Sequence, residues 1–333
     1  MSEANGTIMK AENVVKLFPV KKSSLLAALT RKPPDYVHAV DGVSLDVQVG
    51  DTIAIVGESG SGKTTLARVM LNLIEPTSGK VIWRGKDVST LDKNELFQFR
   101  KDVQIIFQNP GGALNPRKSI FRILSEPLKL HFNIKSGSEL VDRASEALLA
   151  VGLNPAIHLD RHPHEFSGGQ RQRICIARAL SLGAKIIFAD EPVSSLDVSI
   201  QAQILILMKK LKEEFGLTYI FVTHDLALTR SFASRVYVMY LGEIVESGPV
   251  EDIFMEPLHP YTKLLLASTP VPNPKRARSR ETIIPVGEIP SPINPPPGCR
   301  FHTRCALAKA ICKTAKPVVK TVGNRSFACH LVN

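Results

Sequence analysis

The sequence has no apolar run that approaches the roughly 18 residues of a membrane-spanning helix. Its longest apolar stretches, such as Val236–Leu241, have the length of buried strands. The first residues lack the basic-then-apolar pattern of a signal peptide, so we expect a cytosolic chain. Cysteine is also scarce, with five in the chain, and disulfides are not expected in the cytosol.

Acidic residues are fewer than basic ones, 31 against 42, which leaves a formal net charge of +11. This balance permits contact with nucleic acid or an anionic membrane surface, but for most of the lysines a solvated surface is the simpler interpretation. The hydrophobic fraction of 44% is ordinary for a globular protein. A length of 333 residues allows two domains, or one large domain with an appendage.

The most informative stretch fits the phosphate-binding P-loop, G-x-x-x-x-G-K-T. It comprises Gly57, Glu58, Ser59, Gly60, Ser61, Gly62, Lys63, Thr64 and Thr65. The apolar run Thr52–Val56 before it predicts a buried strand, and the run after it tolerates a helix, so the glycines lie at a strand-to-helix turn. Backbone N–H groups at such a turn can bind phosphate, Lys63 can reach the β- and γ-phosphates, and the Thr64 hydroxyl can bind Mg²⁺. A chance glycine-rich turn would not explain Lys63 and Thr64 in register.

Residues 10–50 predict strands. Val43–Val49 alternates apolar and polar side chains, which indicates a strand with one buried face. A basic, proline-containing insertion lies between Phe18 and Val37 and predicts a surface loop. Phe18 can stack on a purine base or can belong to the core, and the sequence alone leaves both interpretations open.

Two further segments carry local structural signals. Asp92, with Glu95 three residues later, predicts a capped helix start. The strand-like run Val103–Phe107 delivers Gln108 to a loop, and helical spacing follows over residues 117–160.

A second glycine-rich segment comprises Ser167, Gly168, Gly169 and Gln170. Ser167 can cap a helix that the sequence continues to Leu180. Two glycines weaken the start of a helix, but they permit the close approach of a phosphate. We therefore interpret the segment as a second anion contact.

Carboxylates follow a short, mainly apolar run that ends in Asp190 and Glu191. Ligands of doubly wound α/β sheets bind at the carboxyl ends of such strands. Asp190 is therefore a candidate ligand of Mg²⁺, and Glu191 is a candidate for orienting or deprotonating the attacking water. Asp197 closes the polar turn that follows. The strand-like run Thr218–Thr223 ends in His224, a candidate contact of the γ-phosphate, although a lone histidine is more often structural.

Together these motifs resemble, over about residues 10–250, the nucleotide-binding subunit of an ATP-binding cassette (ABC) transporter. The matching segments are the Walker A motif (Gly57–Thr65), the Q-loop (Gln108), the family signature (Ser167–Gln170), Walker B with its catalytic glutamate (Asp190–Glu191), the D-loop (Ser194–Asp197) and the switch histidine (His224). Phe166 stands where leucine is usual before the signature, and it remains apolar.

The resemblance implies an α/β fold: a RecA-like P-loop NTPase domain with an antiparallel β subdomain, a helical subdomain and a C-terminal extension that contains cysteines. We expect the nucleotide-binding domain over residues 1–255, its helical subdomain at about 109–180, and the extension over 256–333. The implied enzyme is an ATPase in which two subunits close head to tail, with each ATP between the Walker A of one and the signature of the other. In that arrangement the resemblance assigns Lys63, Glu191 and His224 to catalysis, Thr64, Gln108 and Asp190 to Mg²⁺, and Phe18 and Asp197 to ATP contacts.

The subfamily is indicated by two segments, His259–Leu265 and Asn109–Arg117, which resemble oligopeptide and dipeptide importers. The insertion after Phe18 resembles the F-type subunit of their paired ATPases. The implied partners are a D-type ATPase subunit, two transmembrane permease subunits and an extracellular or periplasmic solute-binding protein, with no nucleic acid. The implied location is the cytoplasmic face of the cell membrane, with the protein peripheral.

Two alternative functions stay open at this point. Importers of nickel or oligosaccharides share the subfamily, because the binding protein rather than the ATPase selects the solute. A soluble ABC ATPase that acts on nucleic acid or ribosomes would suit the basic charge. This second class carries long coiled coils or two cassettes, whereas here only residues 109–165 separate Q-loop and signature, and one cassette is present.

The tail holds four of the five cysteines: Cys299, Cys305, Cys312 and Cys329. Their spacing fits neither a short zinc knuckle nor a ferredoxin motif, so spacing alone indicates a metal site only weakly. The resemblance to peptide importers implies a [4Fe–4S] cluster, with zinc or unliganded thiols as alternatives. Cys175, which lies apart from these, is best explained by helix packing.

Overall fold

The computed structural model describes residues 6–20, 34–268 and 287–332, so most of the insertion predicted after Phe18 lies outside the described residues. The chain divides into two compact units. The first unit contains Gly6, Gln48–Thr52 and Thr90–Val222. The second contains the described residues of Thr7–Val47, of Ile53–Ser89 and of the chain from Thr223 to Val332.

The first unit is built on three parallel strands in the order β8-β7-β6. These are β6 (Val103–Ile106), β7 (Ile186–Asp190) and β8 (Thr218–Thr223). Every residue of β7 and β8 is buried, as expected of parallel strands that are covered on both faces. The strands and their continuous apolar pattern agree with the sequence prediction.

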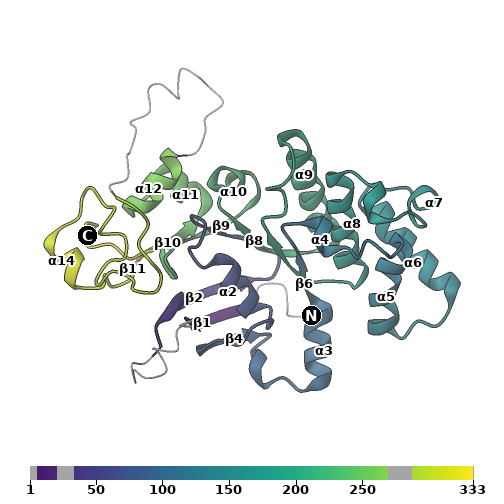
Figure 1. The fold of residues 1–333 in the computed structure, drawn as a ribbon, viewed down its shortest axis with the longest axis horizontal. Helices are drawn as coiled ribbons and strands as arrows, with labels where there is room; N and C mark the ends of the chain where they lie inside the picture. Colours follow the sequence, from purple (N-terminus) through teal and green to yellow (C-terminus); the bar gives the residue numbers. More distant parts are fainter. Residues whose placement is uncertain (1–5, 21–33, 269–286, 333) are drawn as a thin grey trace, which may run out of the picture. The chain divides into compact units, whose positions relative to one another are not determined.

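Most of the rest of the first unit is helical. Its helices are α3 (Lys93–Asp102), α4 (Pro110–Ala113), α5 (Ile120–Phe132), α6 (Gly137–Ala150), α7 (Pro155–His158), the 3-10 turn Pro163–Glu165, α8 (Gly168–Ser181) and α9 (Val198–Phe215). The predicted cap of α3 is present, because the Asp92 carboxylate accepts from the Glu95 N–H at 2.8 Å and the Glu95 carboxylate accepts from the Asp92 N–H at 3.2 Å. Figure 1 shows α5, α6 and α7 grouped on the side of this unit away from β6, and Leu128, Ile134 and Leu140 form a small core there.

The second unit carries an antiparallel sheet in the order β2-β1-β4-β5. It consists of β1 (Thr7–Pro19), β2 (Tyr36–Gln48), β4 (Ser78–Trp83) and β5 (Lys86–Asp87), with the 3-10 turn Val88–Thr90 after it. From Val43 on, β2 alternates buried and exposed residues, as its sequence predicts.

Five further strands of this unit run in the order β11-β12-β10-β9-β3. They are β3 (Thr52–Val56), β9 (Arg235–Tyr240), β10 (Glu243–Pro249), β11 (Lys320–Val322) and β12 (Arg325–Phe327). The pair β3–β9 is parallel, whereas β10 pairs antiparallel with β9 and with β12. The last strands of the chain therefore belong to the same sheet as the P-loop strand β3.

The helices of the second unit are α2 (Lys63–Met70), α10 (Leu226–Phe232), α11 (Val250–Met255), α12 (Pro260–Ala267) and α14 (Ala310–Thr314).

A buried carboxylate, Glu246 on β10, joins the C-terminal segment to the sheet. It accepts hydrogen bonds from the Leu258 and His259 N–H groups, both at 2.9 Å, and pairs with Arg325 at 3.2 Å. Three donors offset the cost of burying this charge.

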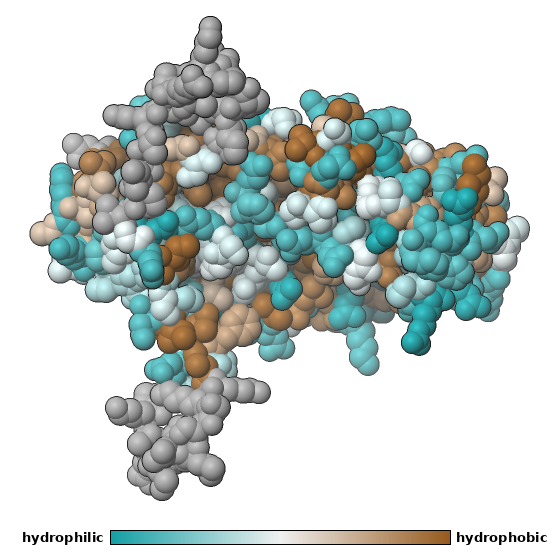
Figure 2. All heavy atoms as spheres, turned by 45° about the horizontal axis from the view of Figure 1, so that its top comes forward, coloured by the Kyte–Doolittle hydropathy of each residue, from teal (hydrophilic) through white to brown (hydrophobic). Residues whose placement is uncertain are grey.

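The surface in Figure 2 carries many hydrophilic side chains, with hydrophobic residues in scattered groups between them. In the part of the chain that the structure describes, no helix has the length and apolar character needed to cross a membrane.

Candidate functional site

The P-loop lies where the sequence predicts it, between the fully buried strand β3 and helix α2. Two of its glycines are required by close packing. A Cβ atom at Gly57 would lie 2.1 Å from the Met239 carbonyl oxygen, and one at Gly62, where φ is +106°, would lie 2.0 Å from the Ala39 carbonyl oxygen. Lys63 is buried, and its ammonium donates to the carbonyl oxygen of Gly57 at 2.8 Å.

Three residues to which the sequence assigned no role at the phosphate site also hold this loop. The Gly242 N–H donates to the Ser61 carbonyl oxygen at 2.8 Å. The Tyr261 hydroxyl accepts from the Glu58 N–H at 2.8 Å, and Arg304 binds the Glu58 carboxylate. These contacts join segments far apart in the chain, so no sequence spacing could have predicted them.

In the first unit, the predicted acids lie at the carboxyl end of β7. Asp190 is its last residue and is 9% exposed. The Gln108 side-chain amide donates to the Glu191 carboxylate at 2.8 Å, so the structure brings the Q-loop and the Walker B residues together. Glu191 has a φ of +45°. This backbone conformation is unfavourable for residues other than glycine, and residues that adopt it often lie at functional sites.

The signature segment begins α8 with a reciprocal cap. The Ser167 hydroxyl accepts from the Gln170 N–H at 3.3 Å, and the Gln170 side chain accepts from the Ser167 N–H at 3.0 Å. A Cβ at Gly169 would lie 2.6 Å from the Ile200 side chain, and Asp197 caps α9 through the Ile200 N–H at 3.1 Å. Packing against α9 therefore gives a second reason for glycine here, besides the approach of a phosphate.

Two other predicted ligand contacts lie in the second unit. Phe18 is in β1, 37% exposed, with the Lys16 ammonium 5.2 Å from its ring centroid. The exposure rules out the alternative that Phe18 is a core residue. His224 is exposed and directly follows β8.

The four tail cysteines lie close enough for their charges to interact. Burial, together with the three other tail thiols, raises the pKa of Cys299 to about 11. Burial likewise raises the pKa of Cys305 and Cys329. Within residues 6–20, 34–268 and 287–332, no three or more His, Cys, Asp or Glu side chains are arranged to hold a metal ion.

The fifth cysteine, Cys175, behaves as a packing residue. It is 1% exposed within α8, and burial raises the pKa of its thiol to about 11. The predicted role in helix packing is confirmed.

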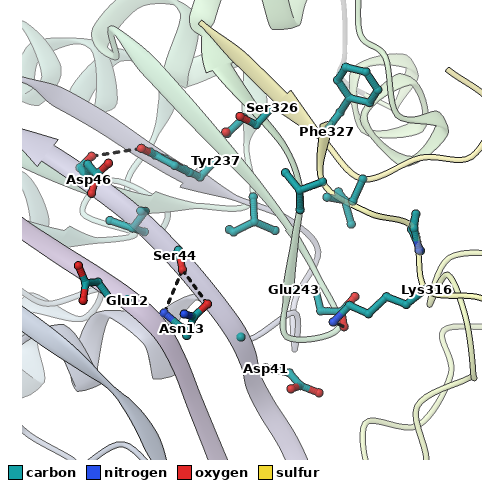
Figure 3. Close-up of a pocket in the computed structure, with 18 of the residues that line it drawn as sticks. Glu12, Asn13, Asp41, Ser44, Asp46, Tyr237, Glu243, Lys316, Ser326 and Phe327 are labelled. Carbon is teal, nitrogen blue, oxygen red and sulfur yellow. Dashed lines mark hydrogen bonds and ion pairs between the residues drawn. The ribbon is translucent and has the colours of Figure 1, made fainter. Parts of the chain in front are cut away.

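A cavity of about 650 Å³ lies in the second unit between the antiparallel sheet and the C-terminal segment. Figure 3 shows Glu243 and Lys316 close together at one end of it, and their side chains pair at 2.7 Å. The side chains of Ser44 and Asn13 hydrogen-bond one another at another part of the wall (Figure 3). These two contacts therefore pair polar groups of the cavity wall with one another.

Comparison with known proteins places these features in a family. Residues 40–194 match the ABC transporter model, and residues 245–312 match the model of the oligopeptide/dipeptide transporter C-terminal region. Among solved structures, the chain is similar to the ATP-binding cassette MJ0796 bound to ADP and Pi, with a TM-score of 0.62 and 32% identity over 73% of this chain and 98% of that one. It is also similar to cbiO1 from Clostridium perfringens, with a TM-score of 0.62 and 27% identity over 75% of this chain and 91% of that one.

Curated relatives match along nearly the whole sequence. The chain is 48% identical to the oligopeptide transport ATP-binding protein AppF of Bacillus subtilis, over 99% of each chain. It is 44% identical to the dipeptide transport ATP-binding protein DppF of Escherichia coli, over 98% of this chain and 95% of that one. The predicted fold and family are confirmed: the chain belongs to the ATP-binding subunits of ABC transporters that carry the oligopeptide/dipeptide C-terminal region.

Proposed function

We propose that this chain hydrolyses ATP and thereby powers the uptake of dipeptides or oligopeptides through separate transmembrane subunits. The observation that carries the proposal is the match to peptide-transport ATP-binding proteins over nearly the full length. A complete set of nucleotide-site side chains supports the enzymatic part. Importers of nickel or oligosaccharides remain the alternative, because the ATPase does not select the solute.

The proposed chemistry uses positioned charge rather than covalent intermediates. Lys63, at the start of α2, stabilises charge on the β- and γ-phosphates. Glu191 accepts the proton of the attacking water or orients it, and the Gln108 amide, 2.8 Å away, holds that carboxylate in place. His224 contacts the γ-phosphate.

Magnesium is the implied metal of this reaction, and it neutralises phosphate charge when bound. The proposed ligands are Thr64, Gln108 and Asp190, whose hydroxyl, amide and carboxylate oxygens are the hard donors that Mg²⁺ prefers. The carboxylate at the end of the buried strand β7 fits this role by position and by charge.

The proposed assembly is a heterodimer with a D-type ATPase, bound to two permease subunits. A solute-binding protein delivers the solute to these permease subunits. Ser167 and the two glycines after it would complete the ATP site of the partner subunit. The chain would act at the cytoplasmic face of the membrane, with residues 1–255 as its nucleotide-binding domain and 256–333 as the extension. ATP sites shared between subunits make hydrolysis depend on the dimer.

We also propose a [4Fe–4S] cluster on Cys299, Cys305, Cys312 and Cys329. Four thiols in one segment supply the ligand chemistry of such a cluster or of zinc. Because the described thiols form no ligand group as they stand, binding would require them to draw together. Anaerobic spectroscopy with iron and sulfide analysis tests the proposal, and zinc without sulfide would refute it.

The transport function is tested by reconstituting the chain with its genomic neighbours in proteoliposomes. A binding protein loaded with dipeptide or oligopeptide is expected to stimulate ATP hydrolysis and to deliver labelled peptide to the lumen. Stimulation by nickel or an oligosaccharide, without a response to peptides, would replace the proposed solute. Sedimentation of the chain only with ribosomes would contradict the importer altogether.

A further inference from the structure

Glu58 occupies one of the P-loop positions that the motif leaves open, yet its backbone and its side chain are both held by hydrogen bonds. Its N–H donates to the Tyr261 hydroxyl at 2.8 Å, and its carbonyl oxygen accepts from the Lys63 ammonium at 2.9 Å. Its carboxylate accepts two hydrogen bonds from Arg304, at 2.7 and 3.0 Å. All three polar groups of one loop residue are therefore satisfied by other parts of the second unit.

The Arg304–Glu58 pair has the geometry of a strong interaction. It is bidentate, the arrangement in which a guanidinium binds a carboxylate best, and the Arg304 side chain is only 6% exposed. The guanidinium also lies 6.0 Å from the ring centroid of Tyr240 and 5.9 Å from that of Phe301, which favours its charged form. Hydrogen bonding to Glu58 is the main cause that raises the pKa of Arg304.

A second arginine of the same segment supports the loop from another side. Arg300 pairs with Asp41 and with Glu243, the latter at 3.2 Å, and donates to the Leu241 carbonyl oxygen. Asp41 and Glu243 line the cavity of Figure 3. Arg300 thereby fixes the turn at Leu241, and the next N–H, that of Gly242, donates to the Ser61 carbonyl oxygen of the P-loop at 2.8 Å.

The segment that carries both arginines is itself well anchored. It runs from Cys299 to Cys305, and the Cys299 N–H donates to the Cys312 carbonyl oxygen at 2.9 Å. Its Phe301 ring packs 5.3 Å from the Tyr261 ring, centroid to centroid. An anchored support can hold its contacts in place at little further cost in conformational entropy.

We propose that residues 299–305, here called the P-loop brace, set the affinity of the Walker A motif for ATP, with Arg304 and Tyr261 as positioning residues that act through Glu58. The phosphate-binding N–H groups follow directly after Glu58, so fixing this residue pre-organises them. The loop then loses less conformational entropy when ATP binds. In this proposal the brace acts on ATP binding through Glu58 and not through a contact of its own with ATP. The inference rests on ATP binding by the P-loop.

The first test measures ATP binding to the full-length chain by titration calorimetry with Mg²⁺. Arg304→Ala is expected to raise the dissociation constant about tenfold, and Tyr261→Phe, which removes only the hydroxyl, about fivefold. The matched control is Arg230→Ala, which removes an exposed bidentate pair with Glu251 in the same unit and should leave the constant unchanged. Wild-type affinity in both Arg304→Ala and Tyr261→Phe would overturn the proposal.

The second test separates positioning from general damage. In the assembled transporter, Arg304→Ala should raise the KM for ATP about tenfold and leave kcat within twofold, whereas a chain that had lost its fold would lose kcat as well. If Arg304→Ala does not fold, a charge-exchanged double variant, Glu58→Arg with Arg304→Glu, provides a second test. The double variant should bind ATP more tightly than Glu58→Arg alone, because it restores the ion pair. Equal affinity of these two variants would contradict the brace.

Lys63→Ala distinguishes the inference from the function on which it rests. ATP binding that survives this substitution would contradict the proposed nucleotide site itself. Loss of binding in Lys63→Ala, together with unaltered binding in Arg304→Ala and Tyr261→Phe, would leave the ATPase intact and refute only the brace.

Discussion

Gly62 is the position where the structure makes its sharpest quantitative prediction. An alanine there must keep φ near +106°, which costs about 1–3 kcal/mol for a residue other than glycine. Its Cβ would also lie 2.0 Å from the Ala39 carbonyl oxygen, and because both groups belong to the backbone, no rotamer change relieves the overlap. Overpacking of this kind adds about 1–3 kcal/mol. We expect Gly62→Ala to lower the free energy of unfolding by about 3 kcal/mol or more.

The matched control is Gly60→Ala in the same loop. Gly60 also has a positive φ, +78°, but a Cβ there would meet nothing within 4 Å, so only the backbone cost of about 1–2 kcal/mol remains. Urea denaturation followed by circular dichroism gives both values, and a repeat with saturating ATP measures the added ligand stabilisation. Equal destabilisation by the two substitutions would refute the reasoning, because it would mean that the overlap with Ala39 is relieved at no cost.

Three further predictions follow from single residues. Burial lowers the pKa of His259 from 6.5 to about 3, so as the pH falls the unfolded chain binds a proton at this ring before the folded chain does. The free energy of unfolding is therefore unaffected by this group above pH 6.5 and falls by about 1.4 kcal/mol per pH unit below it. His259→Asn should reduce this slope when denaturation is measured as a function of pH. Asp92→Ala should cost about 1 kcal/mol of stability through the lost cap of α3, whereas Asp92→Asn should cost less. Cys175 should resist iodoacetamide at pH 8 in the native chain and react in denaturant, as mass spectrometry would show.

Local features of this protein were predictable because their causes lie within a few residues. The strand, glycine turn and helix around Lys63 follow from a motif whose parts are adjacent in sequence, and the cap at Asp92 needs only Glu95. The alternation after Val43 likewise determines which face of β2 is buried. In each case the physical requirement and the residues that meet it are neighbours.

The contacts that hold the P-loop were not predictable, because they join residues that are distant in the chain. Arg304 lies 246 positions from Glu58, and Tyr261 lies 203 positions from it. The His-Pro-Tyr segment indicated a subfamily without indicating what its tyrosine contacts. The glycines of the signature were interpreted through phosphate alone, because the approach of Ile200 to Gly169 depends on how α8 and α9 pack.

We expect that ATP hydrolysis drives peptide uptake and that this hydrolysis depends on Glu191. Substitution of this glutamate tests both points most directly. In proteoliposomes that contain the assembled transporter and a peptide-loaded binding protein, Glu191→Gln should lower ATP turnover by about 10²-fold or more, as expected for a lost general base. ATP should still bind, and uptake of labelled peptide should fall in the same proportion. Wild-type turnover and uptake in Glu191→Gln would contradict the account.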